Sequence, residues 1–254
     1  MLRSWLYVPA HSERFLARAH ERGADAIILD LEDAVPEADK DAARAGLRES
    51  VPAVRRNGAV VYVRINSGAR QMADAAAVRA AGAGIVLAKA RLDVLDRIGG
   101  PLIAMLEDAG AVLDARAFAA HPAVGGLIVG SEDLATTLGA QPTPEVLRTP
   151  KLLVHYAAKA EGKLSLGMLR SIADYSDLDG IGMAAREAKA HGFDGATCVH
   201  PSAVTVLNTA FSPTEAETKW AKRVLAGDRE GAFVVDGKMI DAPVIARARR
   251  ILGR

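Results

Sequence analysis

The chain has 254 residues, half of them hydrophobic and a quarter charged, so it can bury a sizeable core and is not an intrinsically disordered chain. Its 32 basic residues balance 31 acidic ones, for a net charge of +1, which argues against a nucleic acid partner or an anionic membrane surface. A single cysteine, Cys198, excludes a disulfide within the chain, and the first residues resemble neither a signal peptide nor a membrane span, so we expect a cytoplasmic protein.

Short apolar runs alternate with segments of helical pattern along most of the chain. The runs that predict strands are residues 5–8, 26–29, 60–63, 85–87, 102–106, 127–129, 164–166 and 196–199. The segments that predict helices include residues 12–22, 37–55, 143–160 and 181–191. Eight strands, each followed by a helix, match a (β/α)8 TIM barrel, and continuous apolar strands suit a parallel sheet covered on both faces. A doubly wound nucleotide-binding fold is the weaker alternative, because no Gly-x-Gly-x-x-Gly turn follows the first strand.

The chain continues beyond the predicted barrel. We expect residues 1–211 to form a catalytic TIM-barrel domain and residues 212–254 to form a C-terminal extension. Within the extension, the patterns predict a helix at 213–226, a short strand at 231–235 and a last helix at 243–252.

Acidic side chains follow two of the predicted strands directly. Glu107 comes after the strand at 102–106, and Glu132 and Asp133 come after the strand at 127–129. Active sites of such barrels lie where the carboxyl ends of the strands meet, so these acids are expected to lie close together. Hard divalent cations prefer oxygen ligands, and we therefore predict Mg²⁺ bound by Glu107 and Asp133. The alternative is that these acids cap the next helices or occupy their first turns.

Other charged residues at strand ends suggest the chemistry. Arg64 offers a bidentate fork for a substrate carboxylate. A metal ion beside such a clamp suits a 2-oxo acid such as oxaloacetate, glyoxylate or pyruvate, and aldol-type cleavage or formation of a carbon–carbon bond. Glu32 and Asp33 either hold metal-bound waters as a second shell or cap the following helix. Lys89 as a Schiff-base lysine is an alternative route to the same chemistry.

A reaction of this kind releases an enolate and needs an acid that protonates the enolate's carbon, and a base for the reverse step. Glu107 and Asp133 are poor candidates, because binding a metal lowers their basicity. Asp241 lies in the tail, two residues before Pro243, and the family resemblance given below implies that it is the catalytic proton-transfer residue. Its position also fits the N-cap of a proline-started helix, and the two roles are not exclusive.

Several motifs run along nearly the whole chain. They are Arg3-Ser4-Trp5-Leu6-Tyr7-Val8-Pro9, Asp30-Leu31-Glu32-Asp33-Ala34-Val35, Val63-Arg64-Ile65-Asn66, Gly130-Ser131-Glu132-Asp133-Leu134, Gly192-Phe193-Asp194-Gly195, His200-Pro201 and Lys238-Met239-Ile240-Asp241-Ala242-Pro243. Together they resemble the citrate lyase beta-subunit-like branch of the HpcH/HpaI aldolase superfamily.

The resemblance implies a barrel with Mg²⁺ on Glu107 and Asp133, and Arg64 and Glu107 at the substrate. It also implies a homotrimer or a dimer of trimers, in which the tail is an oligomer-contacting lid and Asp241 reaches a neighbouring subunit's active site. The implied activity is a Mg²⁺-dependent carbon–carbon lyase that cleaves a 3-hydroxyacyl-CoA, such as citryl-CoA or malyl-CoA, into an acyl-CoA and a 2-oxo acid. Alternatives on the same scaffold are an acyl-CoA thioester hydrolase, a free-acid aldolase and a non-catalytic subunit of a lyase complex.

The chain departs from the family pattern near its seventh and eighth predicted strands. Residues 164–168 lack an aspartate that the family often carries there, and Ala196 stands where the family usually has lysine. His200 is interpreted as structural rather than catalytic. The resemblance therefore indicates metal and oxo-acid binding more firmly than it indicates a particular acyl-CoA.

Overall fold

The computed structural model describes residues 1–227 and 232–253. The chain divides into two compact units, Met1–Phe211 and Ser212–Arg254. Among the described residues, no helix combines the length and the apolar composition needed to cross a lipid bilayer.

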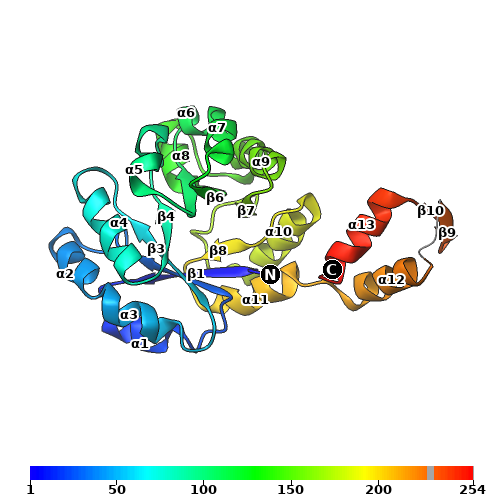
Figure 1. Ribbon diagram of the computed structural model, residues 1–254, viewed down its shortest axis with the longest axis horizontal. Helices are drawn as coiled ribbons and strands as arrows, with labels where there is room; N and C mark the ends of the chain where they lie inside the picture. Colours follow the sequence, from blue (N-terminus) through cyan, green and yellow to red (C-terminus); the bar gives the residue numbers. More distant parts are fainter. Residues whose placement is uncertain (228–231, 254) are drawn as a thin grey trace. The chain divides into compact units, whose positions relative to one another are not determined.

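Eight parallel strands form the sheet of the first unit (Figure 1). They are β1 (Ser4–Pro9), β2 (Ala26–Asp30), β3 (Val60–Ile65), β4 (Gly84–Leu87), β5 (Leu102–Leu106), β6 (Val124–Val129), β7 (Leu164–Leu166) and β8 (Ala196–Cys198). Their order is β7-β6-β5-β4-β3-β2-β1-β8, and a parallel bridge between Leu166 and Gly195 connects its two ends. The sheet therefore closes, and the predicted TIM barrel is confirmed.

Helices surround the strands of this unit (Figure 1). The α-helices are α1 (Glu13–Ala19), α2 (Lys40–Ala45), α3 (Leu47–Val54), α4 (Gln71–Ala80), α5 (Leu95–Ile98), α6 (Ala109–Leu113), α7 (Ala115–Ala120), α8 (Ser131–Thr137), α9 (Pro144–Ala160), α10 (Leu178–His191) and α11 (Ser202–Phe211). Short 3-10 helices are η1 (Glu37–Asp39), η2 (Gly68–Arg70) and η3 (Leu92–Val94).

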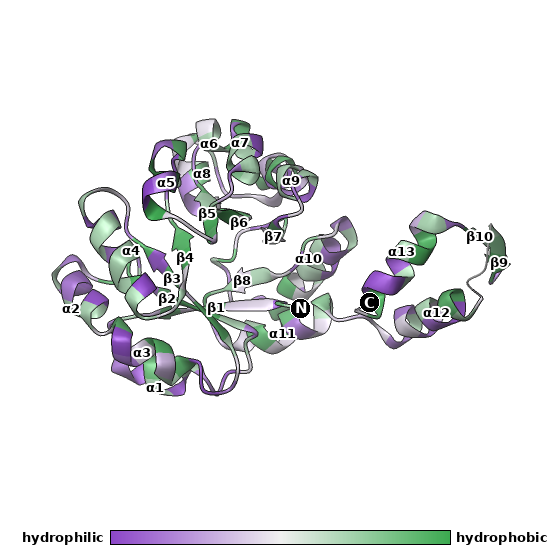
Figure 2. Cartoon of the chain, in the orientation of Figure 1, coloured by the Kyte–Doolittle hydropathy of each residue, from purple (hydrophilic) through white to green (hydrophobic). Residues whose placement is uncertain are grey.

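Alternate residues of each strand pack on opposite faces of the barrel wall. Leu6 and Val8 of β1 join the large apolar layer between the sheet and the helices. Trp5 points the other way and packs inside the barrel with residues such as Ile28 and Met105. Figure 2 shows the consequence: β5 and β6 are hydrophobic along their length, whereas the helices mix hydrophobic and hydrophilic residues.

The inward stripe changes from apolar to charged at the carboxyl ends of the strands. On β2 the inward positions are Ala26, Ile28 and then Asp30, and Met105 of β5 is followed two residues later by Glu107. Asp30 lies beside Arg64 in the register of β2 and β3. Because side chains alternate with a period of two, the strands that fill the barrel also deliver the charged groups to its rim.

The prediction of one helix over residues 37–55 is wrong. The structure divides this segment into η1, α2 and α3. Gly46 separates the last two: its amide bonds the carbonyl of Ala42 and ends α2, while its own carbonyl accepts from Glu49 and starts α3. Glycine has low helix propensity, so a boundary forms there despite the continuous helical pattern.

The second unit contains α12 (Glu215–Ala226), β9 (Phe233–Val235), β10 (Lys238–Ile240) and α13 (Ala242–Ile251). The strand predicted at 231–235 corresponds to β9, although Gly231 lies outside the described residues. The sequence analysis missed β10, which pairs with β9 across Asp236 and Gly237, both with positive φ. An Asp-Gly dipeptide between apolar runs is a strong hairpin signal, so the sequence did carry the information.

Candidate active site

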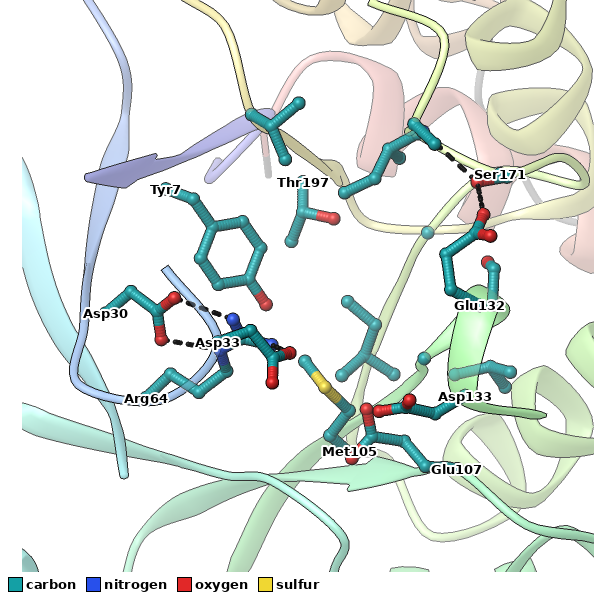
Figure 3. Close-up of a pocket in the computed structure, with 18 of the residues that line it drawn as sticks. Tyr7, Asp30, Asp33, Arg64, Met105, Glu107, Glu132, Asp133, Ser171 and Thr197 are labelled. Carbon is teal, nitrogen blue, oxygen red and sulfur yellow. Dashed lines mark hydrogen bonds and ion pairs between the residues drawn. The ribbon is translucent and has the colours of Figure 1, made fainter. Parts of the chain in front are cut away.

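A pocket of about 420 Å³ opens at the carboxyl ends of the barrel strands (Figure 3). Its walls bring together residues from β1 to β8 that are far apart in the sequence, among them Tyr7, Asp30, Arg64, Glu107, Asp133 and Lys151. A volume of this size accommodates a small organic acid together with part of a larger ligand.

Glu107 and Asp133 meet at one side of this pocket. Figure 3 shows their carboxylates turned toward each other, Glu107 from the end of β5 and Asp133 from the first turn of α8. Glu107 is 5% exposed. Burial raises the pKa of Glu107 to about 8, and the negative charges of Glu32 and Asp133 act in the same direction. Asp133 is 39% exposed, but its carboxylate and that of buried Glu107 repel each other unless a proton or a cation lies between them.

Two neighbours fix the Glu107 side chain. The backbone N–H of Lys89 donates to Glu107 Oε2 at 2.5 Å. Gly130 leaves room on the other side, because a Cβ at that position would lie 2.5 Å from Glu107 Cγ. Lys89 itself has φ of 47°, in the left-handed region that residues other than glycine seldom adopt. The carboxylate is therefore held in place before any ligand binds.

Arg64 forms a bidentate pair with Asp30. Its Nε and Nη2 lie 2.7 Å from the two carboxylate oxygens, and Asp30 also accepts the backbone N–H groups of Glu32 and Ala34. Burial acts to raise the pKa of Asp30, but the hydrogen bonds and charge of Arg64 outweigh it and hold that pKa below its usual value. The guanidinium also lies 5.1 Å from the centre of the Tyr7 ring. Arg64 is thus a fixed cation, and much of its fork is already occupied.

Glu32 and Asp33 contact Arg64 as well. Glu32 is buried, and its Oε2 lies 3.0 Å from Arg64 Nη1 as an ion pair without hydrogen-bond geometry. The Asp33 side chain, 60% exposed, lies 3.1 Å from the same nitrogen. Neither residue caps the next helix, because the N-cap of η1 is Pro36. A role in holding metal-bound water stays a prediction for both.

The structure places the remaining predicted residues as follows. Lys89 Nζ lies 3.0 Å from Glu32 and 3.9 Å from Asp133, and these partners raise its pKa, which disfavours the neutral amine that a Schiff-base lysine needs. Asp241 is the N-cap of α13, and its side chain accepts from the N–H of Val244. It belongs to the second unit, Ser212–Arg254.

Two pocket residues escaped the sequence analysis. Tyr7 follows Trp5 at the strand period of two, which could have placed it on the inward face. Lys151 lies in α9 between Leu147 and Val154, which are also buried, so its spacing already put a lysine on the inner face of the helix. Burial lowers the pKa of Lys151 to about 7.

A second pocket of about 640 Å³ adjoins the first. Both are lined by Tyr7, Pro9 and Val199. The second pocket is also lined by two arginines, one acid and two aromatic rings, which are Arg14, Arg22, Glu21, Phe15 and His200. His200 stacks on Tyr175, with ring centres 5.0 Å apart.

Comparison with known proteins identifies the family. The sequence model of the HpcH/HpaI aldolase/citrate lyase family matches residues 3–90 and 98–201, and the chain belongs to this family. It is similar to a citrate lyase subunit beta-like protein of Mycobacterium tuberculosis, with 38% identity over 98% of this chain and 94% of the relative. It is also similar to a (3S)-malyl-CoA thioesterase of Cereibacter sphaeroides, with 34% identity over 99% of this chain and 94% of that protein.

A solved structure supports the same assignment. The crystal structure of CitE from Mycobacterium tuberculosis in complex with magnesium, acetoacetate and coenzyme A superposes with a TM-score of 0.84. The two sequences are 34% identical, and the superposition covers 99% of this chain and 97% of the CitE chain. The predicted relation to citrate lyase beta-like proteins is therefore confirmed.

The buried amine of Lys151 gives a stability prediction. Its pKa is about 7 in the folded chain, against an ordinary value of 10.5. Between these values the unfolded chain binds more protons, so this group makes the folded state more stable as the pH rises. The variant Lys151→Met lacks this group and serves as the reference. From pH 7 to pH 9, the free energy of unfolding of the wild type should rise relative to that of Lys151→Met by on the order of 2 kcal/mol. Denaturant titrations at several pH values measure it, and a difference that does not change with pH would contradict the assignment.

Proposed function

We propose that this chain is a Mg²⁺-dependent carbon–carbon lyase that cleaves a 3-hydroxyacyl-CoA into an acyl-CoA and a 2-oxo acid. The observation that carries the proposal is the pairing of buried Glu107 with the half-exposed Asp133, in the same pocket as the fixed cation Arg64. The two acids attract a divalent cation, and Arg64 attracts a carboxylate. A 2-oxo acid presents a carboxylate next to a carbonyl oxygen, and this arrangement matches both groups.

The acid pair fits magnesium in number and chemistry. Among residues 1–227 and 232–253, no three or more His, Cys, Asp or Glu side chains are grouped as a metal cage. Mg²⁺ commonly takes only one or two protein carboxylates and fills its other positions with water and substrate oxygens. Glu107 and Asp133 would hold the ion, which would supply Lewis-acid polarisation of the substrate oxygens. The CitE structure from Mycobacterium tuberculosis was solved with magnesium, which supports this choice of ion.

Arg64 would bind the carboxylate of the oxo acid. Its Nε and Nη2 are held by Asp30, so the fork is oriented but not free. Asp33 is its most exposed partner and contacts only Nη1. We propose that the substrate carboxylate replaces Asp33 at this nitrogen, while Asp30 keeps the guanidinium plane fixed.

The adjoining pocket would receive the coenzyme A part of the substrate. Arg14 and Arg22 offer positive charge for phosphates, and Phe15 offers a face for stacking. The thioester end would then reach the acid pocket past Tyr7 and Val199, which line both cavities. The solved CitE complex contains coenzyme A, which supports an acyl-CoA substrate.

The proton balance of the reaction requires a further group. The hydroxyl of the substrate gives its proton to a water molecule, its C–O bond becomes the carbonyl of the 2-oxo acid, and the bond between C2 and C3 breaks, with its electron pair staying on the acyl-CoA as an enolate. C2 must then receive a proton. We propose that Asp241 supplies it, acting on the pocket of a neighbouring subunit in a homotrimer or a dimer of trimers. Its helix-capping hydrogen bond to Val244 would orient the carboxylate for this role.

Product analysis tests the proposed reaction. We expect the purified chain, with Mg²⁺, to convert citryl-CoA or malyl-CoA into acetyl-CoA and a 2-oxo acid. Glu107→Gln and Asp133→Asn should each lower kcat/KM by on the order of a hundredfold or more, because the ion loses half of its protein ligands. Chromatography of the products identifies them.

The matched control for these variants is Glu145→Gln. Glu145 is also an acid in the first turn of a helix, but it is exposed and does not line the pocket. Its variant should cleave like the wild type. Release of free coenzyme A with a hydroxy acid would instead favour the thioester hydrolase, and an inactive wild type would favour a non-catalytic subunit.

Subunit mixing tests the role of Asp241. We expect Asp241→Asn and Glu107→Ala to be inactive alone, and co-assembled mixtures to regain part of the activity. Recovery is expected because some sites then combine an intact acid pair with an intact tail. Full kcat in Asp241→Asn, or no recovery in any mixture, would leave Asp241 with only its helix-capping role.

A further inference from the structure

The pocket holds a second buried cation besides Arg64. Lys151 is 5% exposed and lines the pocket together with Glu107 and Asp133. Leu147 lies four residues before Lys151 and Val154 three residues after it, and both are buried. The three side chains therefore share the buried face of α9, which directs the amine inward. Lysines are seldom buried this deeply without a reason.

The partners of Lys151 distinguish it from the other cations of the site. Its Nζ donates to the backbone carbonyl of Arg170 at 2.9 Å. Within residues 1–227 and 232–253, no carboxylate forms a hydrogen bond or an ion pair with this amine. Arg64, by contrast, is paired with Asp30, and Lys89 with Glu32. An ammonium has three N–H donors, so Lys151 keeps donors for a ligand.

Electrostatics favour an anion beside Lys151. A buried ammonium without a counter-ion is costly, and burial accordingly lowers the pKa of this group to about 7. Glu132 attracts the ammonium from a distance, but its own carboxylate accepts a hydrogen bond from Ser171. A ligand carboxylate at Nζ would raise this pKa again and keep the amine protonated, because it would supply the negative charge that no carboxylate of residues 1–227 and 232–253 supplies by direct contact.

The topology places Lys151 across the rim from Arg64. Arg64 is the next-to-last residue of β3, and the carbonyl that Lys151 binds belongs to the segment after β7. In the closed sheet these strands are four positions apart out of eight, which is the largest separation possible. Glu107 and Asp133 follow β5 and β6, between the two cations.

We propose that Lys151 binds a second, terminal carboxylate of the oxo acid, so that the site selects dicarboxylic 2-oxo acids such as oxaloacetate over monocarboxylic ones such as pyruvate. This inference rests on the proposed function, which assigns the first carboxylate to Arg64. The acid would then extend across the pocket from Arg64, past the metal-binding acids, to Lys151. Lys151 is a specificity-determining residue in this account and takes no part in the bond-breaking step.

A purely structural role makes a different prediction. If Lys151 only holds the segment after β7 through the Arg170 carbonyl, any side chain with an N–H donor should serve. Lys151→Gln keeps a donor and removes the charge, whereas Lys151→Met removes both. The two variants therefore separate charge recognition from loop positioning, and Lys151→Gln provides the test if Lys151→Met does not fold.

The experiment is calorimetric binding of oxaloacetate and of pyruvate to the full chain with Mg²⁺. We expect the wild type to prefer oxaloacetate, and the affinity ratio of the two acids to fall at least tenfold in both Lys151 variants. Lys159→Met is the control: Lys159 lies in the same helix, pairs with Asp194 at 2.6 Å and does not line the pocket, so its variant should keep the wild-type ratio.

Two results would overturn the inference. One is a wild type that binds pyruvate as tightly as oxaloacetate or binds neither acid. The other is an unchanged affinity ratio in Lys151→Gln, which includes equal weakening of both acids. Failure of the proposed lyase reaction is a separate outcome. A wild type that cleaves no acyl-CoA, yet prefers oxaloacetate through Lys151, would contradict the reaction and leave the binding assignment in place.

Discussion

The repulsion between the carboxylates of Glu107 and Asp133 is the constraint on which the rest of the site depends. Burial and neighbouring negative charge raise the pKa of Glu107 to about 8, so the fold holds this acid at a position where its ionised form is unfavourable. The Lys89 amide and the missing side chain of Gly130 keep it there. A divalent cation between the two carboxylates would remove this repulsion. We therefore interpret the pair as a metal-binding site.

The barrel makes this arrangement possible by using one side-chain pattern for two purposes. Inward positions are apolar through the middle of the strands and become charged at their carboxyl ends. The apolar layer around Trp5 fills the barrel below the pocket, so the charged groups lie above a buried hydrophobic layer. The Asp30–Arg64 pair then fixes the cation on one side of the rim, and Lys151 supplies a cation on the opposite side.

Much of the fold and part of the site could be predicted from the sequence. Continuous apolar strands and acids at strand ends predicted the barrel and the meeting of Glu107 with Asp133, because both follow from local pattern and from the closed topology. The sequence analysis did not assign Lys151 to the site, because its role depends on having no carboxylate partner among the residues that the structure describes, and only the packing reveals this. The same limit applies to Arg64: its residue type predicted a substrate clamp, but not that Asp30 already occupies part of the fork.

The most direct measurement of the central claim is isothermal titration of Mg²⁺ into the purified chain. The account predicts one saturable site in the wild type and in Glu145→Gln, and its loss in Glu107→Gln, whose circular dichroism should stay that of a folded barrel. Mg²⁺ binding of undiminished affinity in a folded Glu107→Gln variant would show that the acid pair is not the metal site, and would contradict the account.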